Sequence, residues 1–294
     1  CILCPRACHA DRLDGGVGYC GQTADIMAAR ASLHYWEEPC ISGTSGSGTV
    51  FFSGCNLRCV FCQNHNIALG KAGRVITPEH LVKIFLQLQE QGANNINLVT
   101  PTHFLPQIVI ALQQAKNQGL SIPIVYNTGS YESPEALRHL DGLVDIYLPD
   151  LKYMSSRLGE RYSHAADYFE TASAAIAEMV RQTGGPDFDD KSGLMKKGVI
   201  VRHLVLPGCT ADSKKVISYL YHTYGDRIYI SIMNQYTPME GIGKKFPELN
   251  RKLTEREYDE LVDYAISIGV ENGFIQEGET ASESFIPPFT NEGV

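Results

Sequence analysis

Two features are missing from this sequence, and each absence excludes a class of function. No run approaches the ~18 consecutive apolar residues of a membrane-spanning helix, and the first residues do not show the charged and then apolar stretches of a secretory signal. Lys and Arg form no dense cluster and the net charge is −8, whereas surfaces that bind nucleic acid are basic. We therefore expect a cytoplasmic protein that binds neither a membrane nor nucleic acid.

Cysteine, by contrast, is plentiful. A reducing cytoplasm keeps thiols free for metals or catalysis and disfavours disulfides. The nine cysteines fall into two groups and two isolated residues: Cys1, Cys4, Cys8 and Cys20; Cys55, Cys59 and Cys62; and Cys40 and Cys209. This grouping predicts two metal sites.

Short β-branched or aromatic runs alternate with amphipathic stretches over most of the chain, a pattern typical of strands and helices in turn. The expected strands are 49–53, 95–99, 122–126, 145–148, 199–206, 228–233 and, more weakly, 273–276; the expected helices are 78–91, 104–118, 133–140, 164–183, 211–224 and 254–268. Such alternation predicts an α/β fold of parallel strands with right-handed crossovers, either an open doubly wound sheet or a full or partial barrel. Both architectures place the functional site at the carboxyl ends of the strands.

The second cysteine group lies directly after the first expected strand, in the segment GCNLRCVFCQNHN. Three soft thiolates from one short loop can hold three corners of an iron–sulfur cube, which leaves one iron without a protein ligand. An open metal position is what a catalytic site needs and a structural site avoids. A zinc loop and three unconnected core thiols are the alternative interpretations.

The spacing Cys-x3-Cys-x2-Cys, with Phe61 before the last cysteine, resembles the signature of the radical S-adenosylmethionine (SAM) family. The resemblance implies that Cys55, Cys59 and Cys62 hold a [4Fe–4S] cluster whose open iron binds SAM. It further implies that SAM is cleaved reductively to a 5′-deoxyadenosyl radical, which abstracts hydrogen from a substrate. We therefore expect a partial (β/α)6 TIM-like barrel in residues 43–294, preceded by a small Cys-rich annex in residues 1–42.

From Gly43 onward the chain resembles the pyruvate formate-lyase activating enzymes. Asn64 stands two residues past the last cysteine, Asp150-Leu151-Lys152 resembles an element near SAM, and Arg202 resembles the Arg of a strand that ends in Pro-Gly. The resemblance implies that these residues contact SAM, together with Phe61.

The sequence departs from that family in three places, one of which is Gln63, where the family usually has a His. The Gly-Gly-Glu element that holds the SAM amino group is replaced by VTPTH, where Thr100 and Thr102 offer hydroxyls and carbonyls instead. An acidic position after the third strand is Asn127. We expect the two threonines and Asn127 to contact SAM as well, and we expect Tyr236, which follows the sixth strand, to contact SAM or the substrate.

The first cysteine group lies in a compact, turn-rich segment. Four thiolates form a closed set that suits structural Zn²⁺ or a fully ligated iron–sulfur cluster, and the sequence does not distinguish the two. Because the sequence begins at Cys1 and not at Met, we expect further residues upstream of this motif.

The resemblance thus favours a radical SAM oxidoreductase, with activation of a glycyl-radical enzyme as one role. Radical modification of a small molecule or of another protein is a second interpretation, and a zinc scaffold without catalysis is a third. The expected partners are SAM, an unidentified protein or small-molecule substrate, and an electron donor such as flavodoxin or ferredoxin.

Overall fold

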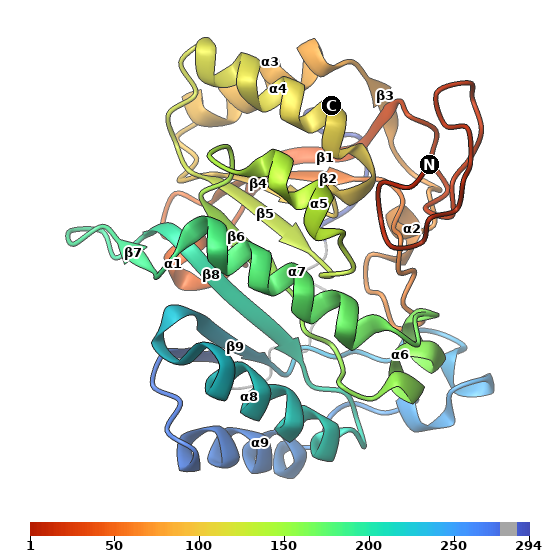
Figure 1. The fold of residues 1–294 in the computed structure, drawn as a ribbon, viewed down its shortest axis with the longest axis vertical. Helices are drawn as coiled ribbons and strands as arrows, with labels where there is room; N and C mark the ends of the chain where they lie inside the picture. The colour runs from red at the N-terminus through yellow and green to blue at the C-terminus, as the bar shows by residue number, and fades with distance from the viewer. Residues whose placement is uncertain (277–286) are drawn as a thin grey trace.

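The computed structural model describes residues 1–276 and 287–294. In this part of the chain ten strands form one sheet in the order β3-β1-β2-β4-β5-β6-β8-β9-β10, with β7 attached to β8 (Figure 1). The strands are β1 Ile26–His34, β2 Ser47–Phe52, β3 Arg74–Ile76, β4 Ile96–Val99, β5 Ile124–Thr128, β6 Ile146–Pro149, β7 Asp187–Phe188, β8 Met195–Leu204, β9 Tyr229–Met233 and β10 Gly273–Ile275.

The seven strands from β2 to β10 along this order run parallel, apart from the attached β7. Each of them overlaps a strand expected from the sequence. The sheet does not close, because β3 and β10 remain its two edges. The fold is therefore the expected partial TIM-like barrel.

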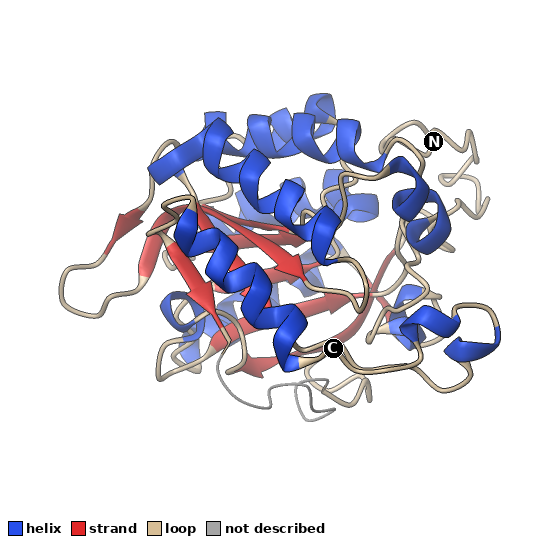
Figure 2. Cartoon of the chain, turned by 90° about the horizontal axis from the view of Figure 1, so that it is seen from below, coloured by secondary structure: helices blue, strands red, loops and turns tan. Residues whose placement is uncertain are grey.

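Helices lie around the outside of the curved sheet (Figure 2). They begin where the sequence supplies caps: Thr77 accepts a hydrogen bond from the His80 amide at 3.2 Å, and Thr254 forms a capping box with Glu257. The helices are α1 Pro39–Ser42, α2 His65–Ala68, α3 Pro78–Glu90, α4 Leu105–Asn117, α5 Pro134–Leu137, α6 Ser156–Ser163, α7 Tyr168–Thr183, α8 Thr210–Tyr224 and α9 Glu255–Ser267, with 3₁₀ turns at 102–104, 138–140, 225–227, 242–244 and 247–249.

One expected helix differs from the structure. The stretch 164–183 was expected to be helical, but α7 begins only at Tyr168, and the separate helix α6, which ends at Ser163, was not expected. His164 between them adopts a left-handed conformation with φ 54°, which ends a helix. The break lets Ser163 turn its side chain toward the cysteine loop described below.

Strand β1 was not expected from the sequence. It pairs antiparallel with β2 on one side and with β3 on the other, and the Ala31 amide donates to the carbonyl of Glu292 near the end of the chain. Residues 26–34 thus belong to the sheet, although they lie inside the segment 1–42 that we expected to form an annex. The division of the chain at residue 42 stays a prediction.

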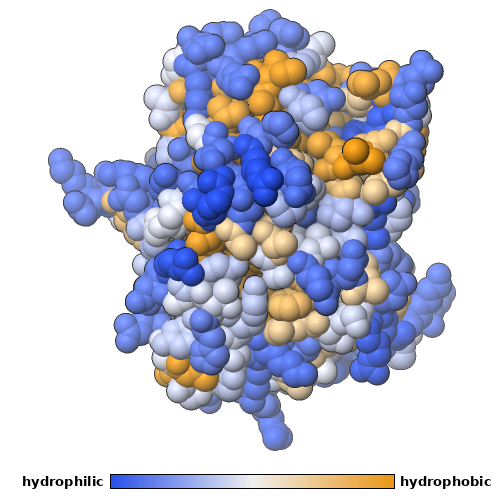
Figure 3. Space-filling view, in the orientation of Figure 1, coloured by the Kyte–Doolittle hydropathy of each residue, from blue (hydrophilic) through white to orange (hydrophobic). Residues whose placement is uncertain are grey.

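Much of the surface in Figure 3 is hydrophilic, with an apolar patch over α3 and α4. The polar segment between α7 and β8 projects from the molecule as the short hairpin of β7 and β8. No helix in the described ranges is both long and apolar enough to cross a membrane.

Candidate active site

A cavity of about 440 Å³ opens at the carboxyl ends of the parallel strands. Its size falls within the range of small-molecule sites. Its walls include the cysteine loop after β2, Thr100 after β4, Asn127 and Thr128 on β5, Asp150 after β6 and Arg202 on β8. Side chains from far-separated parts of the sequence therefore face a single space.

The cysteine loop starts at Gly54, and only glycine fits there. Its φ is 90°, and a Cβ at this position would lie 2.6 Å from Cγ of Gln22 and 2.7 Å from the carbonyl oxygen of Cys20. The sharp turn directs the loop back over the end of β2. Cys55, Cys59 and Cys62 all line the cavity.

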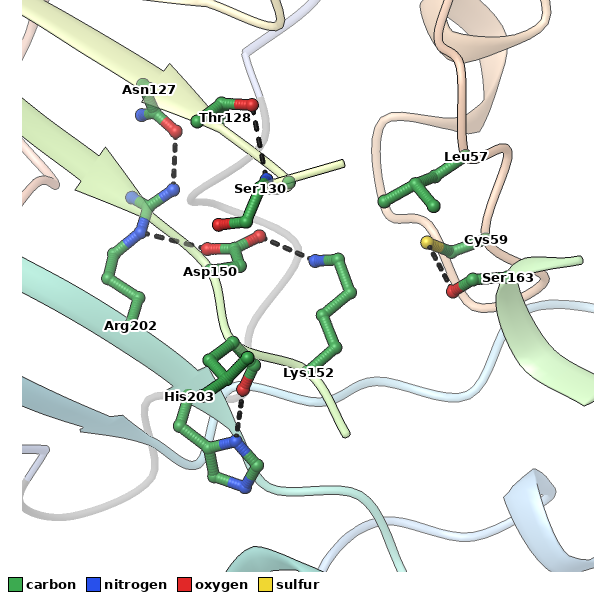
Figure 4. A network of polar contacts seen from close by, with 12 residues as sticks. Leu57, Cys59, Asn127, Thr128, Ser130, Asp150, Lys152, Ser163, Arg202 and His203 are labelled. Carbon is green, nitrogen blue, oxygen red and sulfur yellow. Dashed lines mark hydrogen bonds and ion pairs between the residues drawn. The ribbon is translucent and has the colours of Figure 1, made fainter. Parts of the chain in front are cut away.

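Backbone and side-chain donors hold two of the three sulfurs. The Leu57 amide donates to Sγ of Cys55 at 3.4 Å, and Oγ of Ser163 lies 3.0 Å from Sγ of Cys59 (Figure 4). Burial, with the neighbouring thiols adding to it, raises the pKa of Cys62. Thiolates in such a place need a compensating positive charge, which a bound metal supplies.

An ionic network forms another wall of the cavity, with Arg202 at its centre (Figure 4). The guanidinium donates to Asp150 at 3.2 Å, to Asn127 at 2.5 Å and to Glu37 at 2.9 Å. Lys152 donates to the second oxygen of Asp150 at 2.5 Å. Burial alone would raise the pKa of Asp150, but Lys152 and Arg202 outweigh it and the pKa is lowered. Asp150 is therefore an anion held by two cations.

Glu37 and Glu38 in this region were not foreseen from the sequence. They lie in the segment between β1 and α1, and both line the cavity. Glu37 supplies the negative charge near Arg202 that Asn127 lacks. Burial raises the pKa of Glu38, and its Oε2 has no hydrogen-bond partner. A signal was present in the sequence, because two adjacent carboxylates directly follow the apolar and aromatic residues 33–36.

Threonines form the end of the cavity beside β4 and β5. Thr100, Thr102 and Thr128 line it, and Thr100 has φ 57°, which is strained for a β-branched residue and common at functional sites. Behind them the carboxylate of Glu132 accepts hydrogen bonds from the hydroxyls of Thr102 and Thr128, both at 2.5 Å. Glu132 was also missed, because nothing in the segment YNTGSYESP marks its side chain as buried.

Residues 49–219 match the family model described as the Radical SAM superfamily. The chain belongs to this superfamily. An uncharacterized protein of Methanocaldococcus jannaschii is 29% identical over 280 residues, covering 90% of this chain and 74% of the relative. The pyruvate formate-lyase-activating enzyme of Clostridium pasteurianum is 25% identical over 240 residues, covering 76% of this chain and 94% of the relative.

The fold of this radical SAM protein is similar to that of SuiB from Streptococcus suis bound to S-adenosylmethionine. The TM-score is 0.51 at 14% identity, and the match covers 78% of this chain and 52% of SuiB. The chain thus spans about half the length of that structure. Membership of the superfamily implies an enzyme that uses a [4Fe–4S] cluster and SAM.

The residues of the cysteine loop fit such a cluster. A cube carries its cysteine ligands on separate irons, whereas a zinc loop needs them around one ion. Within residues 1–276 and 287–294 no three His, Cys, Asp or Glu side chains converge closely enough to hold a single ion. The donor set itself fits an iron–sulfur cluster, because three soft thiols line one cavity and thiolates are the usual ligands of such clusters.

The structure brings most of the predicted SAM contacts to the cavity. Asn64 lines it beside the cysteine loop, and Gln63 ties this loop to the end of β9 by donating to the carbonyl of Gln235 at 2.7 Å. Phe61 also lines it, with its ring packed edge-on against Tyr153 and Tyr236. Phe61 thus fixes the loop against the core.

Tyr236 lies elsewhere. It is 0% exposed and donates its hydroxyl to the carbonyl of Leu249 at 2.6 Å. It is not among the residues that line the cavity, but its ring packs against Phe61, which does line it.

The first cysteine group surrounds a turn near the cysteine loop. A Cβ on Gly18 would lie 3.3 Å from Sγ of Cys20 and 3.5 Å from Sγ of Cys8, so these sulfurs are close together. Burial raises the pKa of Cys4, and hydrogen bonds from the backbone of Ala10 and other residues lower that of Cys8. Because no single-ion arrangement is present in the described ranges, the second metal site stays a prediction.

Proposed function

We propose that this protein cleaves SAM reductively and uses the resulting radical to abstract hydrogen from a substrate, with a glycine Cα of a partner enzyme as the first candidate. One observation carries the proposal. The three cysteines and the ion network around Arg202 line the same cavity at the carboxyl ends of the strands. A cofactor held by the cysteines would therefore be within the space that Arg202 and Asp150 also face.

Cys55, Cys59 and Cys62 would hold the cluster, which when bound supplies the electron that breaks the sulfonium bond of SAM and releases a 5′-deoxyadenosyl radical. The protein would orient SAM and exclude water from it. Phe61, packed against the tyrosines behind it, keeps the cysteine loop in place.

Arg202 and Lys152 would orient SAM from the opposite wall. Both are held by Asp150, so their positions are fixed before a ligand arrives, and fixed donors bind an oriented ligand at lower entropic cost. The SAM carboxylate is the group whose charge matches them.

The choice of a glycyl-radical enzyme as substrate is supported by the likeness to the pyruvate formate-lyase-activating enzyme of C. pasteurianum. A small molecule or another protein is the alternative substrate. Flavodoxin or ferredoxin is the proposed electron donor.

The test is the production of 5′-deoxyadenosine by anaerobically reconstituted protein with dithionite and SAM. We expect production in the wild type and none in Cys59→Ala, because two thiolates leave the cube incompletely held. Cys40→Ala is the matched control, since Cys40 is buried in a separate apolar cluster and its loss should leave production unchanged. Production by Cys59→Ala at the wild-type rate would refute the assignment.

The substrate is tested separately, by incubating the active protein with a glycyl-radical enzyme and recording the electron paramagnetic resonance spectrum. A SAM-dependent organic radical on the partner supports activation. Steady 5′-deoxyadenosine release without a radical on the partner favours the alternative substrates.

We also propose a metal at Cys1, Cys4, Cys8 and Cys20. Four thiolates form a closed set that suits a fully ligated iron–sulfur cluster or a structural zinc ion, and the iron content of the reconstituted protein distinguishes the two. Its role would be to hold the Cys-rich annex against the barrel.

A further inference from the structure

Glu132 is a buried carboxylate with an unusual set of neighbours. Its residue exposure is 1%, and its oxygen Oε1 accepts from three hydroxyls: Thr102 and Thr128 at 2.5 Å and Tyr126 at 3.4 Å. Within the part of the chain that the structure describes, no Lys or Arg makes an ion pair with it. A carboxyl group is thus placed behind the cavity wall with hydroxyls as its partners, and because burial raises the pKa of Glu132 to about 7, it carries its full charge at pH 8.

These hydrogen bonds fix the direction in which two threonine hydroxyls point. A hydroxyl has one proton and two lone pairs. Thr102 and Thr128 give their protons to Glu132, so toward the cavity they can only accept. Thr128 also accepts from the Ser130 amide at 3.2 Å, which leaves it one further lone pair. Both threonines line the cavity.

The cavity is therefore electrically asymmetric. On one wall Lys152 and Arg202 present donors, balanced by Asp150 and Glu37. At the other end Thr102 and Thr128 present acceptors, backed by the charge of Glu132. A ligand that carries a carboxylate at one end and an amino group beside it matches this distribution.

We propose that Glu132 is a positioning residue that turns Thr102 and Thr128 into acceptors for the α-amino group of SAM. The inference rests on the proposed function and deepens it, because it names how this chain holds the amino group with threonines at the end of β4. The carboxylate acts through the two hydroxyls, which relay its charge to the cavity.

The test compares two ligands on the reconstituted protein by titration calorimetry at pH 8, above the pKa of about 7 for Glu132. SAM carries the amino group, whereas 5′-deoxy-5′-methylthioadenosine lacks the whole amino-acid part. Glu132→Gln keeps the acceptor oxygen but removes the charge. We expect it to weaken SAM binding about tenfold, the difference between a charge-backed and a neutral hydrogen bond, and to change methylthioadenosine binding less than about twofold.

Two outcomes would overturn the inference: unchanged SAM affinity in Glu132→Gln, or equal losses for both ligands, which would indicate a purely structural role. Should Glu132→Gln fail to fold, the pair Thr128→Ser and Thr128→Val decides. Serine keeps the hydroxyl and should keep SAM affinity, whereas valine should lose it. Failure of the proposed function looks different, because the wild-type protein would then not bind SAM at all.

Discussion

Replacing Glu132 with Gln should stabilise the folded protein while it weakens SAM binding. Burial raises the pKa of Glu132 from 4.5 to about 7, even though three hydroxyls act to lower it. The folded state therefore holds a proton that the unfolded chain releases between these two values. Glu132→Gln carries no charge at any pH and does not titrate.

The magnitude follows from linkage. A difference of 7 − 4.5 = 2.5 pH units, at about 1.36 kcal/mol per unit, corresponds to about 3 kcal/mol. The stability that Glu132 contributes is fully present below pH 4.5 and is lost as the pH rises through about 7. Relative to Glu132→Gln, the wild type should therefore lose about 3 kcal/mol of unfolding free energy between these limits, and nothing more above pH 8.

The assay is urea unfolding of both proteins without SAM from pH 5 to pH 8. Subtracting the unfolding free energy of one protein from that of the other removes the contribution of every group that titrates alike in both. Near Glu132, burial raises the pKa of Tyr126 and Tyr147, so these two hydroxyls do not ionise over this range. A difference that does not change with pH would refute the reasoning, because Glu132 would then not hold its proton to high pH.

Three further predictions concern other parts of the site. Glu37→Gln should lower the unfolding free energy in urea by about 2 kcal/mol, because Arg202 loses one of the two carboxylates paired with it. The control Glu292→Gln, at an exposed carboxylate paired with Arg30, should cost less than about 1 kcal/mol. Equal losses in the two variants would contradict a stabilising role for the pair of Glu37 and Arg202. Gly54→Ala should reduce both the melting temperature and the iron content, because the added Cβ would lie 2.7 Å from a backbone oxygen. The control Gly119→Ala, at φ 101° but with nothing within 4 Å of the added Cβ, should reduce only the melting temperature. A normal iron content in Gly54→Ala would count against the close contact. Metal analysis should find about eight irons per chain in the reconstituted wild type and about four in Cys8→Ala, and identical iron in both proteins would exclude a second cluster at the first cysteine group.

The sequence predicted the parallel part of the sheet because β2, β4, β5 and β6 are buried on both faces, and such strands appear as continuous apolar runs. Strand β1 was not predicted, and the reason is physical. Its sequence IMAARASLH contains three alanines and an arginine and lacks such a run. It forms because β2 and β3 offer it two antiparallel partners, and pairing partners are a tertiary property.

In the candidate site, too, the sequence predicts the residues that a local pattern marks and not those that depend on tertiary neighbours. A local spacing marks Cys55, Cys59 and Cys62, so the sequence alone predicts them as cluster ligands. Nothing local marks Glu132, and the adjacent carboxylates Glu37 and Glu38 give no sign of Arg202, because the importance of these residues depends on which side chains surround them. Position after a strand suggested Tyr236 as a contact, but the direction of its side chain is set by its hydrogen bond to Leu249.

The ion network around Arg202 also bears on how the molecule assembles. Glu37 and Arg202 are 165 residues apart in the chain, and contacts of such long sequence separation form late because loop closure must come first. During synthesis the segment after β1 leaves the ribosome long before β8 has been made, so Glu37 cannot yet pair with Arg202. The complete polar wall therefore arises only when most of the sheet has formed.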